Sequence, residues 1–285
     1  MSTFQLLQGT PFLGANPDAS AAKLVLFGCP YDSTISFRPG SRFGPQAIRT
    51  VSDVLETYCP VMDMDLEDVA FADAGDLLLP PGDTRGALDA IRDMASSVYA
   101  RKQVPAGLGG EHLLSLPLVE AALRACPDLV VVQFDAHMDM RSDYLGVELS
   151  HATVMKKVSD QIGSSRVLHI GCRSGTREEF HAAKTLGNLK PASITGPEIA
   201  EWVGDRPLYV TVDLDILDPS ILPGTGTPEP GGVQFATLQN WLIALAGKRW
   251  VGWDVMELSP MYDSTQVSSI VAAKVVRTMI LASTV

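Results

Sequence analysis

The sequence has little of what marks secreted, membrane or disulfide-stabilised proteins. Its four cysteines show no C-x-x-C spacing and are too sparse for a disulfide scaffold, so we expect reduced and buried thiols. The longest apolar segment, residues 270–281, is interrupted by Lys274 and Arg277 and is too short to cross a bilayer. The N-terminal segment MSTFQLLQGTPFLG lacks a basic stretch followed by an apolar one, which argues against a secretory signal. We therefore expect a cytoplasmic protein that does not bind membranes.

Basic residues are also scarce. Lys and Arg number 22 against 33 Asp and Glu, and the formal net charge is −11. A charge of this sign argues against general binding of nucleic acid phosphates or anionic lipids, and it slightly favours a cationic small molecule. Simple solubility would explain the charge equally well.

Apolar residues, in contrast, are plentiful, at 46% of the 285 residues. No linker divides the chain, so we expect a single domain over residues 1–285. Short apolar runs bounded by Gly, Pro or Asp are typical of strands buried on both faces. These runs cover residues 24–27, 69–72, 104–108, 129–134, 167–170, 208–212 and 250–255.

Segments with helical spacing lie between these runs. They cover residues 45–57, 84–99, 116–125, 235–245 and 265–281. The alternation predicts a three-layer α/β/α sandwich around a mainly parallel sheet of roughly eight strands. An eight-fold β/α barrel is the alternative, because a strand count does not separate an open sheet from a closed one.

Two of the predicted strands end in clustered carboxylates. The run VVVQF is followed by Asp135, His137 and Asp139, and the run LYVTV by Asp213 and Asp215. In an extended backbone, residues two apart share a face, so each set can point at one place. Ligands of open α/β sheets bind at the carboxyl ends of strands. Each carboxylate alone could be a helix cap or a turn residue, but the two patterns together favour a shared site.

A third strand-like run leads to His112 in GLGGEH. Taken alone, His112 would more often be a capping or packing histidine, but its place at a strand end favours a ligand. Glu111 beside it is either an acceptor that supports the site or a solvated carboxylate. His169, inside a strand-like run, and His181, in a charged helical stretch, are expected to be a core residue and an exposed residue respectively.

This set of side chains predicts a metal centre. Four aspartates in one place repel one another unless cations lie among them. Oxygen and imidazole ligands suit Mn²⁺ and, less selectively, Fe²⁺, Co²⁺, Ni²⁺ or Zn²⁺, and this many ligands match a pair of ions. The predicted metal ligands are His112, Asp135, His137, Asp139, Asp213 and Asp215.

Five segments, in the order GGEH, DAHMD, SHATVM, DLDILDP and WDVMELSP, resemble the signature segments of the ureohydrolases, the family of arginase, agmatinase, guanidinobutyrase and formiminoglutamase. The segments SFRPGSRFGPQAIR and PGTGTPEPGG further resemble the agmatinase branch. The resemblance implies a three-layer fold, two Mn²⁺ ions per subunit, and hydrolysis of a guanidino group to urea and an amine. It also implies that Asp135 and Asp213 bridge the ions. The remaining ligands would divide into His112 with Asp139 on one ion and His137 with Asp215 on the other.

The resemblance also implies two catalytic residues. His151 matches the proton-shuttling histidine of the family, and Glu257 matches the carboxylate that receives the guanidinium. A carboxylate can pair with a planar guanidinium through two parallel hydrogen bonds, and an imidazole can protonate the departing amine. Without the family context, His151 could be a surface-loop histidine.

The segment MRSDYLGVELSH, after D-x-H-x-D, resembles the agmatinase type rather than the arginase type. We therefore expect agmatine to be converted to putrescine and urea, a step of polyamine biosynthesis. The family resemblance further implies a homo-oligomer, either a trimer or a hexamer. Guanidinobutyrate, aminopropylagmatine and arginine are alternative substrates, and the loop 222–233 would line the pocket or make subunit contacts. A metal-dependent deacetylase and a non-catalytic binding protein are alternatives of a different class. Glu257 and the complete ligand set disfavour both.

Overall fold

The computed structural model describes residues 4–16 and 19–285. The first three residues of the segment considered as a secretory signal lie outside the described residues. Among the described residues, no helix is both long and apolar enough to cross a membrane.

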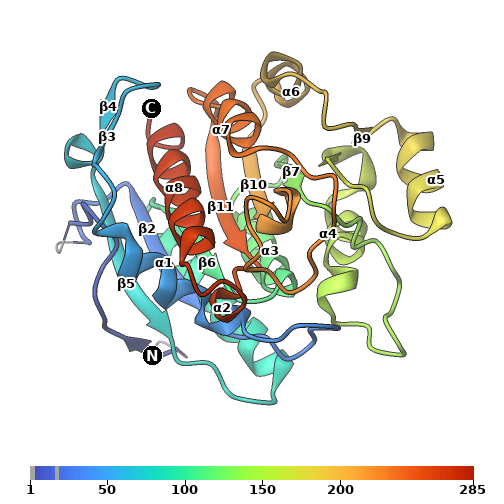
Figure 1. The fold of residues 1–285 in the computed structure, drawn as a ribbon, viewed down its shortest axis with the longest axis horizontal. Coiled ribbons are helices and arrows are strands. Elements are labelled where there is room, and N and C mark those ends of the chain that lie inside the picture. The colour runs from blue at the N-terminus through green and yellow to red at the C-terminus, as the bar shows by residue number, and fades with distance from the viewer. Residues whose placement is uncertain (1–3, 17–18) are drawn as a thin grey trace.

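Within the part of the chain that the structure describes, one sheet of nine strands runs through the molecule (Figure 1). In spatial order, its strands are β1 (Leu6–Leu7), β5 (Phe71–Leu77), β2 (Leu24–Cys29), β6 (Val104–Gly109), β11 (Trp250–Met256), β10 (Leu208–Asp213), β7 (Val130–Phe134), β8 (Val167–Ile170) and β9 (Leu189–Lys190). Neighbouring strands are parallel except for β1 and β5. The prediction of a mainly parallel sheet is confirmed. The count is nine rather than roughly eight because β1 and β9, at two residues each, are too short to give an apolar run.

The barrel alternative is wrong, because β1 and β9 form the two edges of an open sheet. A separate two-stranded antiparallel sheet consists of β3 (Tyr58–Cys59) and β4 (Met64–Asp65). The four central strands are predominantly apolar and buried along almost their whole length, which is why they lack the alternation of half-exposed strands.

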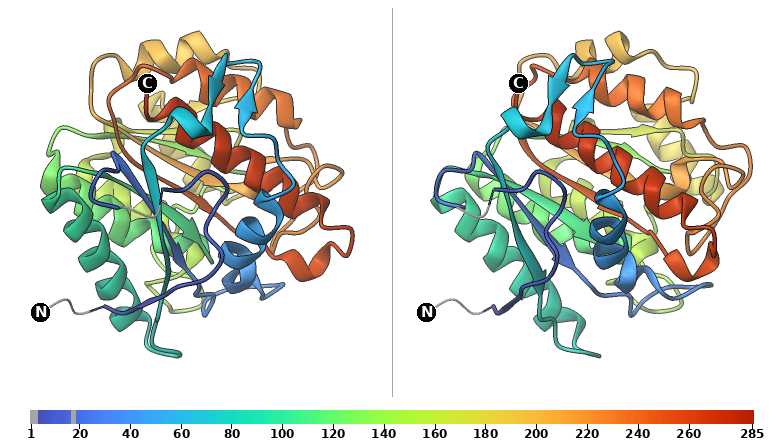
Figure 2. Two further views of the ribbon diagram at one scale, coloured as in Figure 1. Left: turned by 90° about the vertical axis from the view of Figure 1, so that its left-hand side faces the viewer. Right: turned by 60° about the vertical axis from the view of Figure 1, so that its left-hand side comes forward.

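Helices cover both faces of the sheet (Figures 1 and 2). One core cluster joins the sheet to α1 (Gly44–Ser52), α6 (Gly196–Val203), α7 (Phe235–Ala244) and α8 (Val267–Ala282). The other joins it to α2 (Thr84–Ala100), α3 (Ser115–Ala125) and α4 (Val154–Ile162). The remaining helix, α5 (Arg177–Leu186), lies near the edge strand β9. This is the predicted three-layer α/β/α sandwich.

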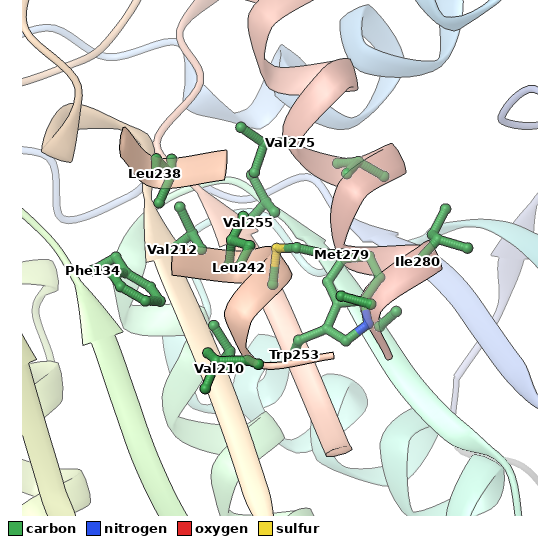
Figure 3. Close-up of a cluster of buried hydrophobic side chains, with 14 of the residues drawn as sticks. Phe134, Val210, Val212, Leu238, Leu242, Trp253, Val255, Val275, Met279 and Ile280 are labelled. Carbon is green, nitrogen blue, oxygen red and sulfur yellow. The ribbon is translucent and has the colours of Figure 1, made fainter. Parts of the chain in front are cut away.

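Figure 3 shows the part of the first core cluster in which α7 and α8 lie on β10 and β11. Trp253 of β11 is fully buried there, and Phe134 of β7 stacks on Trp241 of α7 with ring centroids 5.5 Å apart. Because interiors of this kind are close-packed, the central strands form a rigid base for the loops that follow them.

Two predicted segments differ from the structure by more than two residues at one end. The helix expected over residues 45–57 ends at Ser52, and Arg277 donates to the carbonyl groups of Glu56 and Tyr58 beyond that end. The strand expected over residues 69–72 runs instead from Phe71 to Leu77. Asp73, Gly75 and Asp76 interrupt the apolar pattern after residue 72, so the rest of this strand did not appear as an apolar run.

Candidate metal centre and active site

The predicted site residues follow four strands that are neighbours in the sheet. In the order β6, β11, β10 and β7, these strands are parallel, so their carboxyl ends meet at one edge. Asp213 ends β10, Glu257 and Asp135 directly follow β11 and β7, and His112 follows β6 after two residues. The fold therefore brings together segments that are far apart in the sequence.

The backbone turns sharply within the D-x-H-x-D segment. Strand β7 ends at Phe134, and the expectation that the whole segment is extended is wrong, because Asp139 has a positive φ of 52°. The Oδ1 atom of Asp135 accepts the backbone N–H of His137 over 2.6 Å, which stabilises the turn. In the same way, Oδ1 of Asp213 accepts the N–H of Asp215 over 2.9 Å, at the start of a 3-10 helix over Leu214–Ile216.

The six predicted ligands nevertheless lie in one cluster. The Nδ1 atom of His112 is 3.0 Å from Asp135 Oδ2, 3.1 Å from Asp139 Oδ2 and 3.3 Å from Asp213 Oδ2. The Nδ1 atom of His137 is 2.9 Å from Asp215 Oδ2 and 3.8 Å from Asp135 Oδ1. Two sets of three have ligand atoms that all lie within 4.8 Å of one another, and Asp135 belongs to both. These sets are His112, Asp135 and Asp213, and Asp135, His137 and Asp215.

The cluster concentrates negative charge in a buried place. Burial raises the pKa of Asp135 to about 7, and repulsion by Asp139 and Asp215 adds to the effect. Burial raises the pKa of Asp213 well above its usual range, again with a contribution from Asp215. Burial alone would lower the pKa of His137, but the charge of Asp215 outweighs it and raises the pKa to about 10. A divalent cation would offset the same repulsion, so the donor set fits a metal ion.

Two chains of hydrogen bonds support the candidate metal ligands His112 and Asp135. His112 Nε2 is 2.9 Å from Thr211 Oγ1, and that hydroxyl donates to Asp254 Oδ1 over 2.6 Å. Asp254 is fully buried. With Nδ1 facing the carboxylates, Nε2 carries the proton and donates to Thr211. Such support for a metal-binding histidine fixes its ring orientation.

The second chain supports Asp135. Gln133 Nε2 donates to Asp135 Oδ2 over 2.6 Å, and Gln133 Oε1 lies 2.5 Å from His169 Nδ1. Burial lowers the pKa of His169 to about 4, which keeps it neutral. His169 is thus a core residue, as expected, and it also orients Gln133. His181 is exposed, as expected.

Glu257 and His151 each present one unpartnered polar atom in the described structure. Glu257 Oε1 accepts the backbone N–H of His112 over 2.7 Å, whereas Oε2 is buried without a partner. His151 begins a 3-10 helix over His151–Thr153, and its Nε2 is also buried without a partner. Buried polar atoms normally have partners, so both atoms point to a ligand at this edge of the sheet.

Comparison with known proteins decides the family. Residues 22–282 match the model of the arginase family. The chain belongs to the arginase family. This confirms the resemblance to the ureohydrolases that the ordered segments predicted.

Members of the arginase family with known names match almost the whole chain. The agmatinase of Bacillus cereus is 43% identical over 278 residues, which are 96% of each chain. The proclavaminate amidinohydrolase of Streptomyces clavuligerus is 33% identical over 91% of this chain and 88% of its own. The crystal structure of agmatine ureohydrolase of Thermoplasma volcanium superposes with a TM-score of 0.86 at 32% identity, covering 97% of this chain and 95% of that one.

A pocket of about 220 Å³ opens over this arginase-family site. Asp139, His137 and His151 line it, together with Arg141 and Tyr144 from the loop after β7. Tyr144 meets the His151 ring edge-on, with centroids 6.3 Å apart, and the Arg141 guanidinium lies 5.5 Å from the centroid of the Tyr144 ring. The pocket thus has polar groups at the cluster and an aromatic wall beside it.

The long loop over residues 222–233 lines this pocket through Thr227, one of its two predicted roles. Thr227 Oγ1 lies 3.3 Å from Asp215 Oδ2. Arg173, after β8, donates to the carbonyl groups of Asp215 and Glu229 over 2.8 and 2.7 Å, and so ties the loop to the ligand turn. Sequence reasoning missed Arg173 and Thr211. A signal existed for Asp254, a carboxylate within an apolar strand.

Proposed function

We propose that this protein hydrolyses agmatine to putrescine and urea with two Mn²⁺ ions. The observation that carries the guanidino chemistry is the buried, unpartnered Oε2 of Glu257 beside the ligand cluster. The choice of agmatine is supported by the agmatinase of Bacillus cereus, at 43% identity, against 33% for the proclavaminate amidinohydrolase.

The proposed metal ligands are the six clustered residues. Asp135 and Asp213 would bridge, His112 and Asp139 would complete one site, and His137 and Asp215 the other. The bound pair would supply activation of a water molecule for attack near neutral pH. The distances and the mixed oxygen and imidazole donors fit hard divalent ions such as Mn²⁺.

Glu257 would receive the guanidinium. Burial raises the pKa of Glu257 well above its usual range, with a contribution from the charge of Glu111. A cationic guanidinium would offset that cost by pairing with the carboxylate through Oε2. Space for this group is left by Gly226, because a Cβ there would lie 3.5 Å from Glu257 Oε2 and 3.1 Å from the carbonyl oxygen of Arg38. The guanidino carbon would thus be oriented toward the cluster.

His151 would transfer the proton. Burial lowers its pKa, so the ring is neutral near pH 7 and can accept a proton from the attacking water. The C–N bond to the amine breaks only when that nitrogen is protonated, and Nε2 of His151 would deliver the proton. The bonding electron pair stays on that nitrogen, so it departs as a neutral amine, and the proton that the urea oxygen then loses protonates the amine in solution.

One observation favours a second substrate, guanidinobutyrate. Arg141 lines the pocket, and none of the described ion pairs includes it. A substrate that carries a carboxylate in place of the agmatine ammonium would find a partner in this guanidinium.

The test is urea release by the Mn²⁺-loaded protein from agmatine, guanidinobutyrate, aminopropylagmatine and arginine in parallel. The proposal expects the highest kcat/KM for agmatine. Preference for guanidinobutyrate, lost in Arg141→Ala, would replace agmatine by the second candidate. Release from none of the four would contradict the proposed function.

We also propose that residues 1–285 form one domain of a cytoplasmic homo-oligomer. The uninterrupted family match over residues 22–282 supports the single domain. Light scattering of the purified protein would distinguish a trimer or hexamer from a monomer.

A further inference from the structure

Glu111 is a buried carboxylate that the proposed chemistry does not use. It has no exposed surface, although it lies next to the candidate ligand His112. Its Oε2 accepts the backbone N–H of Thr34 over 2.6 Å, and its Oε1 accepts the Thr34 hydroxyl over 2.8 Å. The hydroxyl oxygen of Thr34 in turn accepts the backbone N–H of His151 over 2.9 Å. Donation therefore runs in one direction, from His151 to Thr34 to Glu111.

Burial of a carboxylate at this position lowers the stability of the folded protein. None of the ion pairs within 4.0 Å among the described residues gives Glu111 a Lys or Arg partner. Burial of a carboxylate without a paired cation costs stability, and the two bonds from Thr34 offset part of that cost, with a smaller contribution from the charge of Arg42. A role beyond packing would explain why a carboxylate stands there.

The hydrogen bonds of the segment that contains His151 indicate such a role. Within this short 3-10 helix, Ser150 Oγ accepts the N–H of Ala152 over 3.3 Å, and Thr153 Oγ1 accepts the N–H of Ser150 over 3.1 Å. The N–H of His151 lies between them and goes to Thr34, on the loop after β2. Thr34 is therefore the link between the His151 segment and the rigid end of β6.

The residues that directly follow β6 also position Glu257. The carbonyl of Gly110 accepts the N–H of Glu257 over 2.9 Å, and the N–H of His112 donates to Glu257 Oε1. Residues 110–112 thus connect one candidate metal ligand, the guanidinium acceptor and, through Thr34, the proton-transferring histidine.

We propose that Glu111 and Thr34 are positioning residues that hold His151 at the distance and angle needed for proton transfer. This inference rests on the proposed function, in which His151 transfers the proton. Neither residue touches the reacting atoms, and both act through the backbone of His151.

The test compares two replacements of Thr34. Thr34→Val keeps the shape but removes the hydroxyl, and Thr34→Ser keeps the hydroxyl. We expect Thr34→Val to lower kcat by about 10- to 100-fold at unchanged Mn²⁺ content and nearly unchanged KM, because a misplaced acid loses most of its contribution. Thr34→Ser should recover most of kcat. The exposed Thr185→Val, which loses a hydroxyl bond to the His181 carbonyl, is the matched control and should behave as wild type.

A double-mutant cycle separates positioning from a general structural effect. In a His151→Asn background, Thr34→Val should change the residual kcat by less than about twofold, because residues that act as one unit are not additive. An equal loss in both backgrounds would overturn the inference, as would wild-type kcat in Thr34→Val. Glu111→Gln, which places an amide N–H against one of the two Thr34 donors, should show the same pattern if Thr34→Val does not fold.

A measurement without turnover makes this test independent of the substrate. Amide hydrogen exchange of residues 150–155, followed by mass spectrometry, should be about tenfold faster in Thr34→Val than in Thr34→Ser. Equal protection in the two variants would overturn the inference. If the exchange differs but no guanidino compound gives urea, the positioning stands and the proposed function fails.

Discussion

The backbone N–H of His112 donates to Oε1 of Glu257 over 2.7 Å. These residues follow β6 and β11, which pair in parallel through Ala106 and Trp253. The pairing of β6 with β11 therefore fixes the position of the candidate metal ligand relative to the candidate guanidinium acceptor. Movement of either strand end would change the distance between the metal centre and the substrate.

The first prediction concerns Oε2 of Glu257, which has no partner among the described residues. Glu257→Gln keeps an oxygen for His112 but removes the charge that would pair with the guanidinium. Hydrogen bonds to charged groups contribute about 1.5–3 kcal/mol, so kcat/KM for the preferred substrate should fall by about 10- to 100-fold. Initial rates of urea release measure this, and Mn²⁺ content should stay at the wild-type value. Unchanged kcat/KM would remove Glu257 from substrate binding.

The second prediction concerns Asp135, which belongs to both sets of ligand atoms. Asp135→Asn should lose bound Mn²⁺ and activity together, because both proposed ions lose a ligand. Elemental analysis after gel filtration measures the metal directly. Asp160→Asn is the control, since Asp160 pairs with Lys156 on an exposed helix surface, and this variant should retain both ions. Full metal content in Asp135→Asn would contradict the bridging assignment.

Most residues of the candidate site could be predicted from the sequence because local patterns mark them. Each of Asp135, Asp213 and His112 follows or ends an apolar run, and parallel strands bring such ends to one edge. Alternation along an extended chain correctly grouped Asp139 with its neighbours, although the chain reaches that position through a left-handed turn. Helices α5 and α6 were not among the predicted segments, although the capping boxes that begin at Thr176 and Thr195 are a local signal for both.

Features that depend on contacts between residues far apart in the sequence could not be predicted from local patterns. Strand β5 holds Asp73 and Asp76 beyond residue 72, where the predicted strand ended. Both resemble loop residues in the sequence, but Arg49 of α1 pairs with both in the structure. The contact of His112 with Thr211 spans 99 residues, and no local pattern marks it. Sequence periodicity therefore locates strand ends, whereas the side chains that support them require the register of the whole sheet.

The third prediction concerns that distant support of His112. Thr211→Val removes the hydroxyl between His112 Nε2 and Asp254 and leaves a buried carboxylate with one donor fewer. Loss of such support weakens metal binding by about 10- to 100-fold. Competition with a chelator measures the Mn²⁺ affinity. Thr278→Val is the control, because Thr278 is equally buried but its hydroxyl donates to the Lys274 carbonyl within α8. Equal affinities in the two variants would contradict a role for Thr211 and Asp254 at the metal centre.

The last prediction concerns the pH dependence of Mn²⁺ binding. A ligand must be deprotonated to bind a metal, so each ligand whose pKa lies above the working pH releases a proton on binding. The pKa of Asp135 is raised to about 7 and that of His137 to about 10. At pH 8, His137 should release its proton while Asp135 is already mostly ionised, whereas at pH 6 both should release one.

The apparent Kd should therefore rise as the pH falls, and more steeply below pH 7 than above it. One released proton corresponds to about a tenfold change in Kd per pH unit. Calorimetry in two buffers of different ionisation enthalpy counts the released protons at pH 6 and pH 8. A larger proton release at pH 6 than at pH 8 would support Asp135 as a ligand that protons and Mn²⁺ compete for. Equal release at the two pH values would mean that Asp135 does not titrate with metal binding, and its place in the centre would then depend on the Asp135→Asn result alone.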